Sequence, residues 1–151
     1  ISLAEEILTQ AKRQSVRVLL PEDHVVAGAP KSNEKPSVVE GNIPSHLMGL
    51  DIGPKTTEGF TSAIRSAKMV LWNGPLGLFE EKPFHRGTEA IARALANSGA
   101  TVIVAGGDTV AAVTQAGVER KITHLSTGGG ATLEFLEGKI LPGIEALEER
   151  G

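Results

Sequence analysis

Apolar residues recur along this chain in two patterns, one typical of strands and one typical of helices. Short runs rich in β-branched residues predict strands over residues 16–20, 24–27, 48–53, 69–72, 102–105 and 122–127. Apolar residues three or four positions apart predict helices over about 2–14, 57–67, 88–98, 109–116 and 131–137. Strands that alternate with helices of this length pair in parallel through right-handed crossovers. The pattern therefore predicts an α/β fold, a Rossmann-like three-layer α/β/α sandwich with a mostly parallel sheet.

Glycine, proline and polar residues mark the ends of these elements. Gly99, Gly117 and Gly138 follow three of the predicted helices, where a residue in the left-handed conformation ends a helix. Residues 28–44 contain repeated Gly, Pro, Ser, Asn and Lys. This composition predicts a surface excursion, with one short edge strand at residues 37–40.

The composition fits one soluble domain, because 151 residues with 40% hydrophobic side chains are enough to bury a core. A net charge of −3 and only 3% aromatic residues argue against a nucleic-acid surface. The absence of cysteine excludes disulfides, thiolate metal sites and a cysteine nucleophile. No apolar run approaches the roughly 20 residues of a membrane helix. We therefore expect a cytoplasmic protein with neither a nucleic-acid nor a membrane partner.

Three predicted strands run directly into turns of glycine and small polar residues. The turns are Asn73-Gly74-Pro75-Leu76-Gly77-Leu78-Phe79-Glu80, Gly106-Gly107-Asp108-Thr109 and Gly128-Gly129-Gly130-Ala131. Ligands of open parallel sheets bind beyond the carboxyl ends of the strands. The sequence therefore predicts that these turns form one site, and that the site takes a phosphate.

The turn from Gly106 to Thr109 places a carboxylate and a hydroxyl at the start of a helix. Free backbone N–H groups and the helix dipole favour a phosphate there. Mg²⁺ held between Asp108 and phosphate oxygens would make the carboxylate compatible with the anion, and Thr109 could donate a further hydrogen bond. Asp and Thr are also common N-caps, so a purely capping role for either residue stays open.

Gly128, Gly129 and Gly130 leave the backbone amides at the start of the last predicted helix free of side chains. Such amides suit a transferring phosphoryl group with developing charge. The alternative is a tight turn that needs positive φ, which is the commoner reason for a lone triple glycine.

Asn73 and Glu80 flank a turn whose course Pro75 and Gly77 restrict. The amide could meet a phosphate and the carboxylate could meet ribose hydroxyls, although Glu80 by itself also fits a solvated surface acid. The chain contains no Walker loop and no complete dinucleotide fingerprint, which argues against a nicotinamide oxidoreductase.

Taken in order along the chain, these motifs resemble the phosphoglycerate kinase family, specifically the later part of its C-terminal, nucleotide-binding domain. The resemblance is carried by Asp51-Ile52-Gly53-Pro54-Lys55-Thr56, the stretch from Trp72 to Glu80, Gly106-Gly107-Asp108-Thr109, and Ser126-Thr127-Gly128-Gly129-Gly130-Ala131 followed by Leu133-Glu134-Phe135-Leu136-Glu137-Gly138-Lys139. It covers essentially the whole chain except the excursion at 28–44. Residues 1–151 are therefore expected to form part of one such domain, with a sheet that is incomplete on its N-terminal side.

The resemblance implies Mg²⁺-dependent, reversible transfer of a phosphoryl group between 1,3-bisphosphoglycerate and ADP, which gives 3-phosphoglycerate and ATP in glycolysis. Asp108 is implied to hold the metal, Asn73 to lie against the phosphate chain and Glu80 to bind the ribose. Gly129 and Gly130 are implied as catalytic residues that face the transferring group. The residues implied in binding the nucleotide ADP or ATP are Asn73, Pro75, Gly77, Glu80, Gly106, Gly107, Asp108 and Thr109.

A whole member of this family also has an N-terminal domain that binds the phosphoglycerate, and an earlier loop that carries glycine and lysine. This chain starts at Ile1 without a methionine, so we expect a longer protein upstream. Closure of two domains excludes water from the reaction, so this chain alone should be nearly inactive. An uncovered sheet edge should favour self-association, whereas the whole family member is expected to be a monomer. A nucleotide-binding module without catalysis is the alternative.

Overall fold

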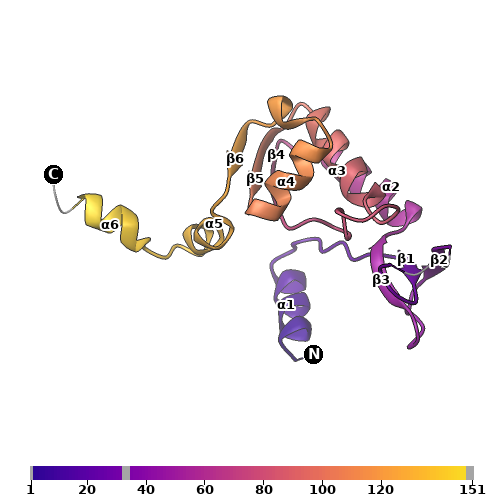
Figure 1. Ribbon diagram of the computed structural model, residues 1–151. Helices are drawn as coiled ribbons and strands as arrows, with labels where there is room; N and C mark the ends of the chain where they lie inside the picture. The colour runs from indigo at the N-terminus through magenta and orange to yellow at the C-terminus, as the bar shows by residue number, and fades with distance from the viewer. Residues whose placement is uncertain (1, 32–34, 149–151) are drawn as a thin grey trace.

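The computed structural model describes residues 2–31 and 35–148 (Figure 1). Ile1 and residues 32–34 of the predicted excursion lie outside this part. In chain order the elements are α1 (Ser2–Arg13), β1 (Asp23–Ala27), β2 (Ser37–Glu40), β3 (Met48–Ile52), α2 (Pro54–Ser66), β4 (Met69–Asn73), α3 (Arg86–Ala96), β5 (Thr101–Ala105), α4 (Gly107–Gln115), the 3₁₀ helix η1 (Glu119–Lys121), β6 (His124–Ser126), α5 (Gly129–Leu136) and α6 (Pro142–Glu148).

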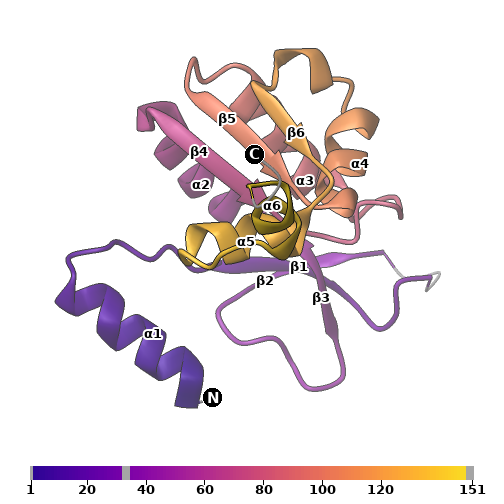
Figure 2. The same cartoon turned by 90° about the vertical axis from the view of Figure 1, so that its left-hand side faces the viewer.

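Strands β4, β5 and β6 form a parallel sheet in that order, which confirms the predicted α/β class and parallel pairing. Helices α2, α3 and α4 lie on one face of this sheet, and α5 lies on the other side (Figures 1 and 2). The core lies between the sheet and the three helices. Its buried members include Trp72, Ile91, Leu95, Val102, Val104 and Val113. The other face is less covered, since Met69 is 66% exposed.

Strands β1, β2 and β3 form a second sheet, which is antiparallel and has the order β2-β1-β3. The sequence predicted these strands but not their antiparallel pairing. Parallel neighbours need a crossover connection, usually a helix. No helix lies between these strands among the described residues, so antiparallel pairing is the geometry open to them.

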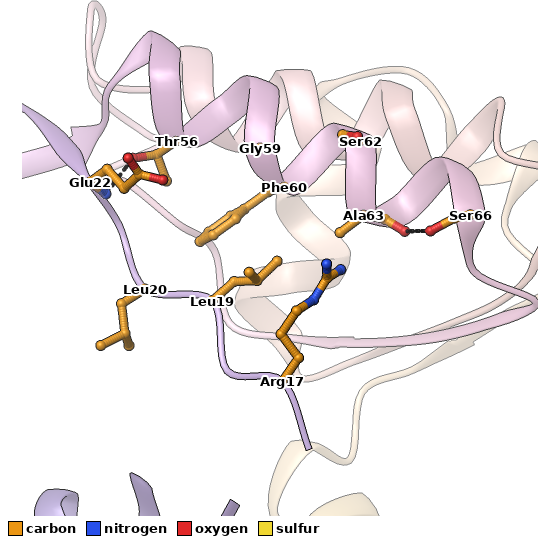
Figure 3. A pocket seen from close by; sticks show the side chains of 10 residues that line it. All are labelled: Arg17, Leu19, Leu20, Glu22, Thr56, Gly59, Phe60, Ser62, Ala63 and Ser66. Atoms are coloured by element: carbon orange, nitrogen blue, oxygen red, sulfur yellow. Dashed lines mark hydrogen bonds between the residues drawn. The ribbon is translucent and has the colours of Figure 1, made fainter. Parts of the chain in front are cut away.

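The strand predicted over residues 16–20 is wrong. This segment is extended but pairs with no described strand, and Val16 and Leu20 are 55% and 61% exposed. The segment lies along α2 instead, where it borders a hollow of about 250 Å³ with Leu19 and Arg17 opposite Phe60 and Ser66 (Figure 3). A β-branched run becomes a strand only where another strand offers its free N–H and C=O groups.

Helix α2 begins at Pro54, earlier than the predicted cap at Thr57. The side chain of Asp23, at the start of β1, caps this helix: its carboxylate accepts the N–H of Lys55 at 2.9 Å and of Thr56 at 2.7 Å. A distant residue thus supplies the cap, while Thr57 Oγ1 donates to Gly53 O at 2.8 Å. The predicted helix ends at Gly99, Gly117 and Gly138 are confirmed, with φ of 71°, 68° and 77°.

Among the described residues, no helix combines the length and the apolar character that a membrane crossing requires.

Candidate functional site at the strand ends

The turns that follow β4, β5 and β6 lie next to one another, as the sequence predicted. Asn73 Nδ2 donates to Gly129 O at 3.4 Å, which joins the end of β4 to the start of α5. Gly106 N donates to Ser126 O at 2.9 Å, which joins the end of β5 to the end of β6. A Cβ built on Gly106 would lie 3.2 Å from Asn73 Oδ1. Asn73, Gly106 and Gly129 therefore form one cluster, drawn from three separate strand–helix units.

At the start of α4, Asp108 and Thr109 face in different directions. Asp108 is exposed and belongs to the first turn of the helix, whose N-cap is Gly106 without any side-chain cap hydrogen bond. The capping interpretation of Asp108 is therefore wrong. Thr109 is 1% exposed, and its Oγ1 accepts the N–H of Gly74 at 2.8 Å. This bond ties the β4 turn to α4, and a contact between Thr109 and a phosphate stays a prediction.

The glycines at the start of α5 do not serve a positive-φ turn. Gly128 is the N-cap with φ of −82°, and Gly129 and Gly130 form the first turn of the helix. A Cβ on Gly129 would lie only 3.0 Å from Gly106 Cα, whereas a Cβ on Gly130 would meet no atom within 4 Å. Packing against Gly106, the N-cap of α4, therefore accounts for the glycine at 129. Nothing in the described protein accounts for the glycine at 130, which leaves free space above the helix N-terminus.

The turn that follows β4 is fixed by one bond from β4 itself and by one bond to β3. Trp72 Nε1 donates to Gly74 O at 2.8 Å, and Leu78 N donates to Leu50 O in β3, also at 2.8 Å. Between this turn and β3 lies a hollow of about 330 Å³. Its lining residues are Gly49, Leu50, Pro75, Leu76, Gly77 and Leu78. The predicted Pro75 and Gly77 thus line a concave surface beside Asn73.

Glu80 lies at the far end of this turn and is exposed. The preceding residue, Phe79, is 6% exposed, and its carbonyl accepts the side-chain N–H of Gln115 in α4 at 3.1 Å. The backbone before Glu80 is thereby anchored, while the carboxylate of Glu80 stays free to turn. No hydrogen bond joins Glu80 to the Asn73 cluster, and its contact with a ribose stays a prediction.

Three buried polar residues support the site, and none of them was predicted among the site residues from the sequence. Thr88 accepts an N–H of the β4 turn, Asp51 accepts the N–H of Gly87 at the start of α3, and Asp23 caps α2. Burial raises the pKa of Asp51 above its usual 3.8, against the lowering effect of N–H groups from Gly87 and Ile52. The Asp51 to Thr56 motif was visible in sequence, but only tertiary contacts show what its carboxylate holds. Thr88 carries no sequence signal beyond its place near the start of a helix.

A metal at this site would depend on one carboxylate. The described residues contain no group of three or more His, Cys, Asp or Glu that could hold a metal ion. Asp108 nevertheless fits Mg²⁺ bound to a nucleotide, because Mg²⁺ keeps several waters and uses one or two carboxylates together with phosphate oxygens. Its exposed position, beside the N–H groups of Gly106 and Gly107, allows that arrangement.

Comparison with known proteins matches residues 1–139 to the family described as phosphoglycerate kinase. Phosphoglycerate kinases of Clostridium botulinum (strain Eklund 17B / Type B) and Pelotomaculum thermopropionicum are each 52% identical to the chain over 99% of its length. The structure of phosphoglycerate kinase from Coxiella burnetii matches with a TM-score of 0.89 and 38% identity, over 95% of this chain. The structure of phosphoglycerate kinase from Pyrococcus horikoshii OT3 matches with a TM-score of 0.79 and 32% identity, over 97% of this chain.

These matches cover only part of each relative. The chain spans 38% of the length of both curated relatives, and 38% and 36% of the two solved chains.

Proposed function

The chain belongs to the phosphoglycerate kinase family, and on that premise we propose that its strand-end turns bind the ADP or ATP of a Mg²⁺-dependent phosphoryl transfer. The reaction would be the reversible transfer between 1,3-bisphosphoglycerate and ADP, which gives 3-phosphoglycerate and ATP in glycolysis. We also propose a cytoplasmic location, in keeping with a glycolytic role. The observation that carries the proposal is the cluster of Asn73, Gly106 and Gly129 beside the exposed Asp108.

In this proposal the two helix N-termini receive the phosphates. The N–H of Gly107 lies at the start of α4, where free amides and the helix dipole favour anions, whereas the N–H of neighbouring Gly106 already donates to Ser126 O. Asp108 would hold Mg²⁺, which neutralises phosphate charge when it is bound. Asn73 lies between α4 and α5 and can donate its amide to the phosphate chain. The buried Thr109 would act mainly by joining α4 to the β4 turn.

The other end of the nucleotide would lie along the β4 turn. The hollow beside Pro75 and Gly77 has apolar walls and suits a flat base. Glu80, at the end of the same turn, would bind the ribose hydroxyls as a free carboxylate.

Gly129 and Gly130 would act on the transferring phosphoryl group. Phosphoryl transfer depends on positioning and on electrostatic stabilisation rather than on a protein nucleophile. The exposed amide of Gly130 at the start of α5 can stabilise the charge that spreads over the equatorial oxygens, whereas the N–H of Gly129 already donates to Thr127 O at 3.1 Å. The absence of a side chain at Gly130 lets the group approach.

A nucleotide-binding module without turnover is the second candidate. The length of the chain favours this candidate, because the chain spans only 38% of the length of its curated relatives. A phosphoglycerate-binding domain, as whole family members have, would have to supply the second substrate. We therefore propose that the chain alone binds nucleotide and has little turnover.

A calorimetric titration with ADP, with and without Mg²⁺, tests the proposal. Saturable binding that needs Mg²⁺ is expected, and Asp108→Ala should abolish the Mg²⁺-dependent part while the far-UV circular dichroism stays unchanged. Glu58→Ala, which removes an exposed carboxylate from α2, is the matched control and should bind as the unmodified chain does. Equal binding by Asp108→Ala and Glu58→Ala would contradict the role of Asp108.

A further inference from the structure

The β4 turn is held from below by the buried hydroxyl of Thr88. Thr88 belongs to the first turn of α3 and is 1% exposed. Its Oγ1 accepts two consecutive backbone N–H groups, from Leu76 and from Gly77, each at 3.1 Å. Since an unpartnered buried N–H is costly, this single oxygen fixes where the middle of the turn lies.

The carboxylate of Asp51 packs against Gly77 of the same turn and holds the start of α3. Asp51 is 4% exposed, and its Oδ2 accepts the N–H of Gly87, at the start of α3, at 2.7 Å. A Cβ built on Gly77 or on Gly87 would overlap the Asp51 carboxylate, so both backbones approach it as closely as glycine allows. We call Thr88 and Asp51 together the turn clamp.

The turn clamp reaches both walls of the hollow beside Asn73. Leu76 and Gly77, which Thr88 holds, line one wall. Leu50, which directly precedes Asp51, lines the other, and its carbonyl accepts the N–H of Leu78 across the gap. A shift of either clamp residue would therefore change the separation of the walls.

We infer that Thr88 and Asp51 are positioning residues that set the width of this hollow and hence its affinity for the flat ring of a nucleotide base. This inference rests on the nucleotide binding proposed above. Neither side chain touches the ligand, because both are buried beneath the turn. We expect the clamp to change the affinity for the ring and not the affinity for the phosphates, because neither Thr88 nor Asp51 forms a hydrogen bond with a residue at the N-terminus of α4 or α5.

Thr88→Val tests the clamp, because valine keeps the shape of threonine and removes the acceptor oxygen. Hydrogen exchange at the amides of Leu76 and Gly77 should become faster by about tenfold, and the affinity for Mg²⁺-ADP should fall by about five- to tenfold. The affinity for Mg²⁺-tripolyphosphate, which has no base, should stay unchanged. Thr88→Ser, which restores the oxygen, should recover both properties. If Thr88→Val fails to fold, Asp51→Asn carries the affinity test. Faster exchange is then expected at the amide of Gly87 or of Ile52, because asparagine offers one acceptor oxygen in place of two.

Each other result has a definite meaning. For Thr88→Val, unchanged hydrogen exchange at Leu76 and Gly77, unchanged Mg²⁺-ADP affinity, or an equal loss of affinity for Mg²⁺-ADP and Mg²⁺-tripolyphosphate would overturn the inference. None of these results would contradict the proposed nucleotide binding by the unmodified chain. If the unmodified chain bound no Mg²⁺-ADP, the proposed function would fail, and an NMR titration with adenosine alone would decide the inference. Weaker adenosine binding by Thr88→Val would then support it, and an absence of adenosine binding by the unmodified chain would overturn it.

Discussion

Neighbouring glycines in one turn can be required for different reasons. Gly129 and Gly130 look equivalent in sequence, and both were predicted to face the transferring group. In the structure Gly129 packs against the backbone of Gly106, because a Cβ on Gly129 would lie 3.0 Å from Gly106 Cα. A Cβ on Gly130 would face open space. The glycine at 129 is therefore explained by packing between α5 and the N-cap of α4, and the glycine at 130 is left for the ligand.

Alanine substitutions should separate these two reasons. Gly129→Ala should lower the free energy of unfolding by about 1–3 kcal/mol, because its methyl group presses on a neighbouring backbone. Gly130→Ala should leave stability unchanged or slightly raised, since alanine favours a helix and meets no atom here. Urea denaturation followed by Trp72 fluorescence, the signal of the single tryptophan, measures both.

The role of Gly130 can also be tested by measuring turnover in a complete member of the family. There Gly130→Ala should lower turnover by at least about tenfold, with a smaller effect on nucleotide affinity, because the lost interaction belongs to the transition state. Equal stability of the two variants, or full turnover by Gly130→Ala, would contradict the separate roles given to Gly129 and Gly130.

At the scale of elements, helix α2 depends on a residue far from it in sequence. Asp23 is 2% exposed, and besides the two backbone N–H groups its carboxylate accepts the hydroxyl of Thr56 at 2.6 Å. A Cβ on Gly53 would overlap this carboxylate. Burial raises the pKa of Asp23, but the hydrogen bonds from Thr56 and Lys55 outweigh it and bring the pKa below the usual 3.8. The ionised side chain therefore stabilises the junction of β1 and α2.

This cap predicts a pH dependence of stability with a definite sign. Below pH 3.8 the unfolded chain binds more protons at Asp23 than the folded chain does. The contribution of Asp23 should be complete above this pH and should be lost as the pH falls through the lower pKa of the folded state. Asp23→Asn should cost about 1.5–3 kcal/mol near neutral pH and less at pH 3, because it weakens hydrogen bonds to a charged group.

Urea denaturation between pH 3 and pH 7 checks this dependence. Glu58→Gln, an exposed change within α2, is the control and should follow the unmodified chain at every pH. A constant difference between Asp23→Asn and the unmodified chain over the whole range would contradict the role of the charge.

At the scale of the molecule, β4 is a free edge of the parallel sheet in the described structure. It pairs with β5 on one side only. Beside it lies an apolar hollow of about 290 Å³, with Leu19, Phe60, Leu71 and Leu76 among its lining residues. Free N–H and C=O groups next to an apolar surface form a template for another chain. This arrangement supports the expected self-association.

Self-association should therefore depend on concentration and on β4. Sedimentation velocity at increasing concentration should show species larger than 15.8 kDa. Met69→Lys places a charge on the edge strand at a residue that is 66% exposed, so it should reduce association without loss of stability. Gln10→Lys adds the same charge at an exposed polar position of α1 and should have no such effect. Association that Met69→Lys leaves unchanged would exclude this edge as the contact.

Hydrophobic periodicity and glycine stops are local signals, and they were enough to predict the α/β class, most of the elements and the grouping of the strand-end turns. The meeting of Asn73, Gly106 and Gly129 also followed from the sequence, since parallel strands end at one edge of a sheet. The remaining features depend on contacts between distant parts of the chain. Residues 16–20 are no strand because no described strand lies beside them, and α2 begins at Pro54 because Asp23 reaches it from β1. Thr88 and Asp51 support the turn through contacts between residues 11 to 36 positions apart, which no local pattern records.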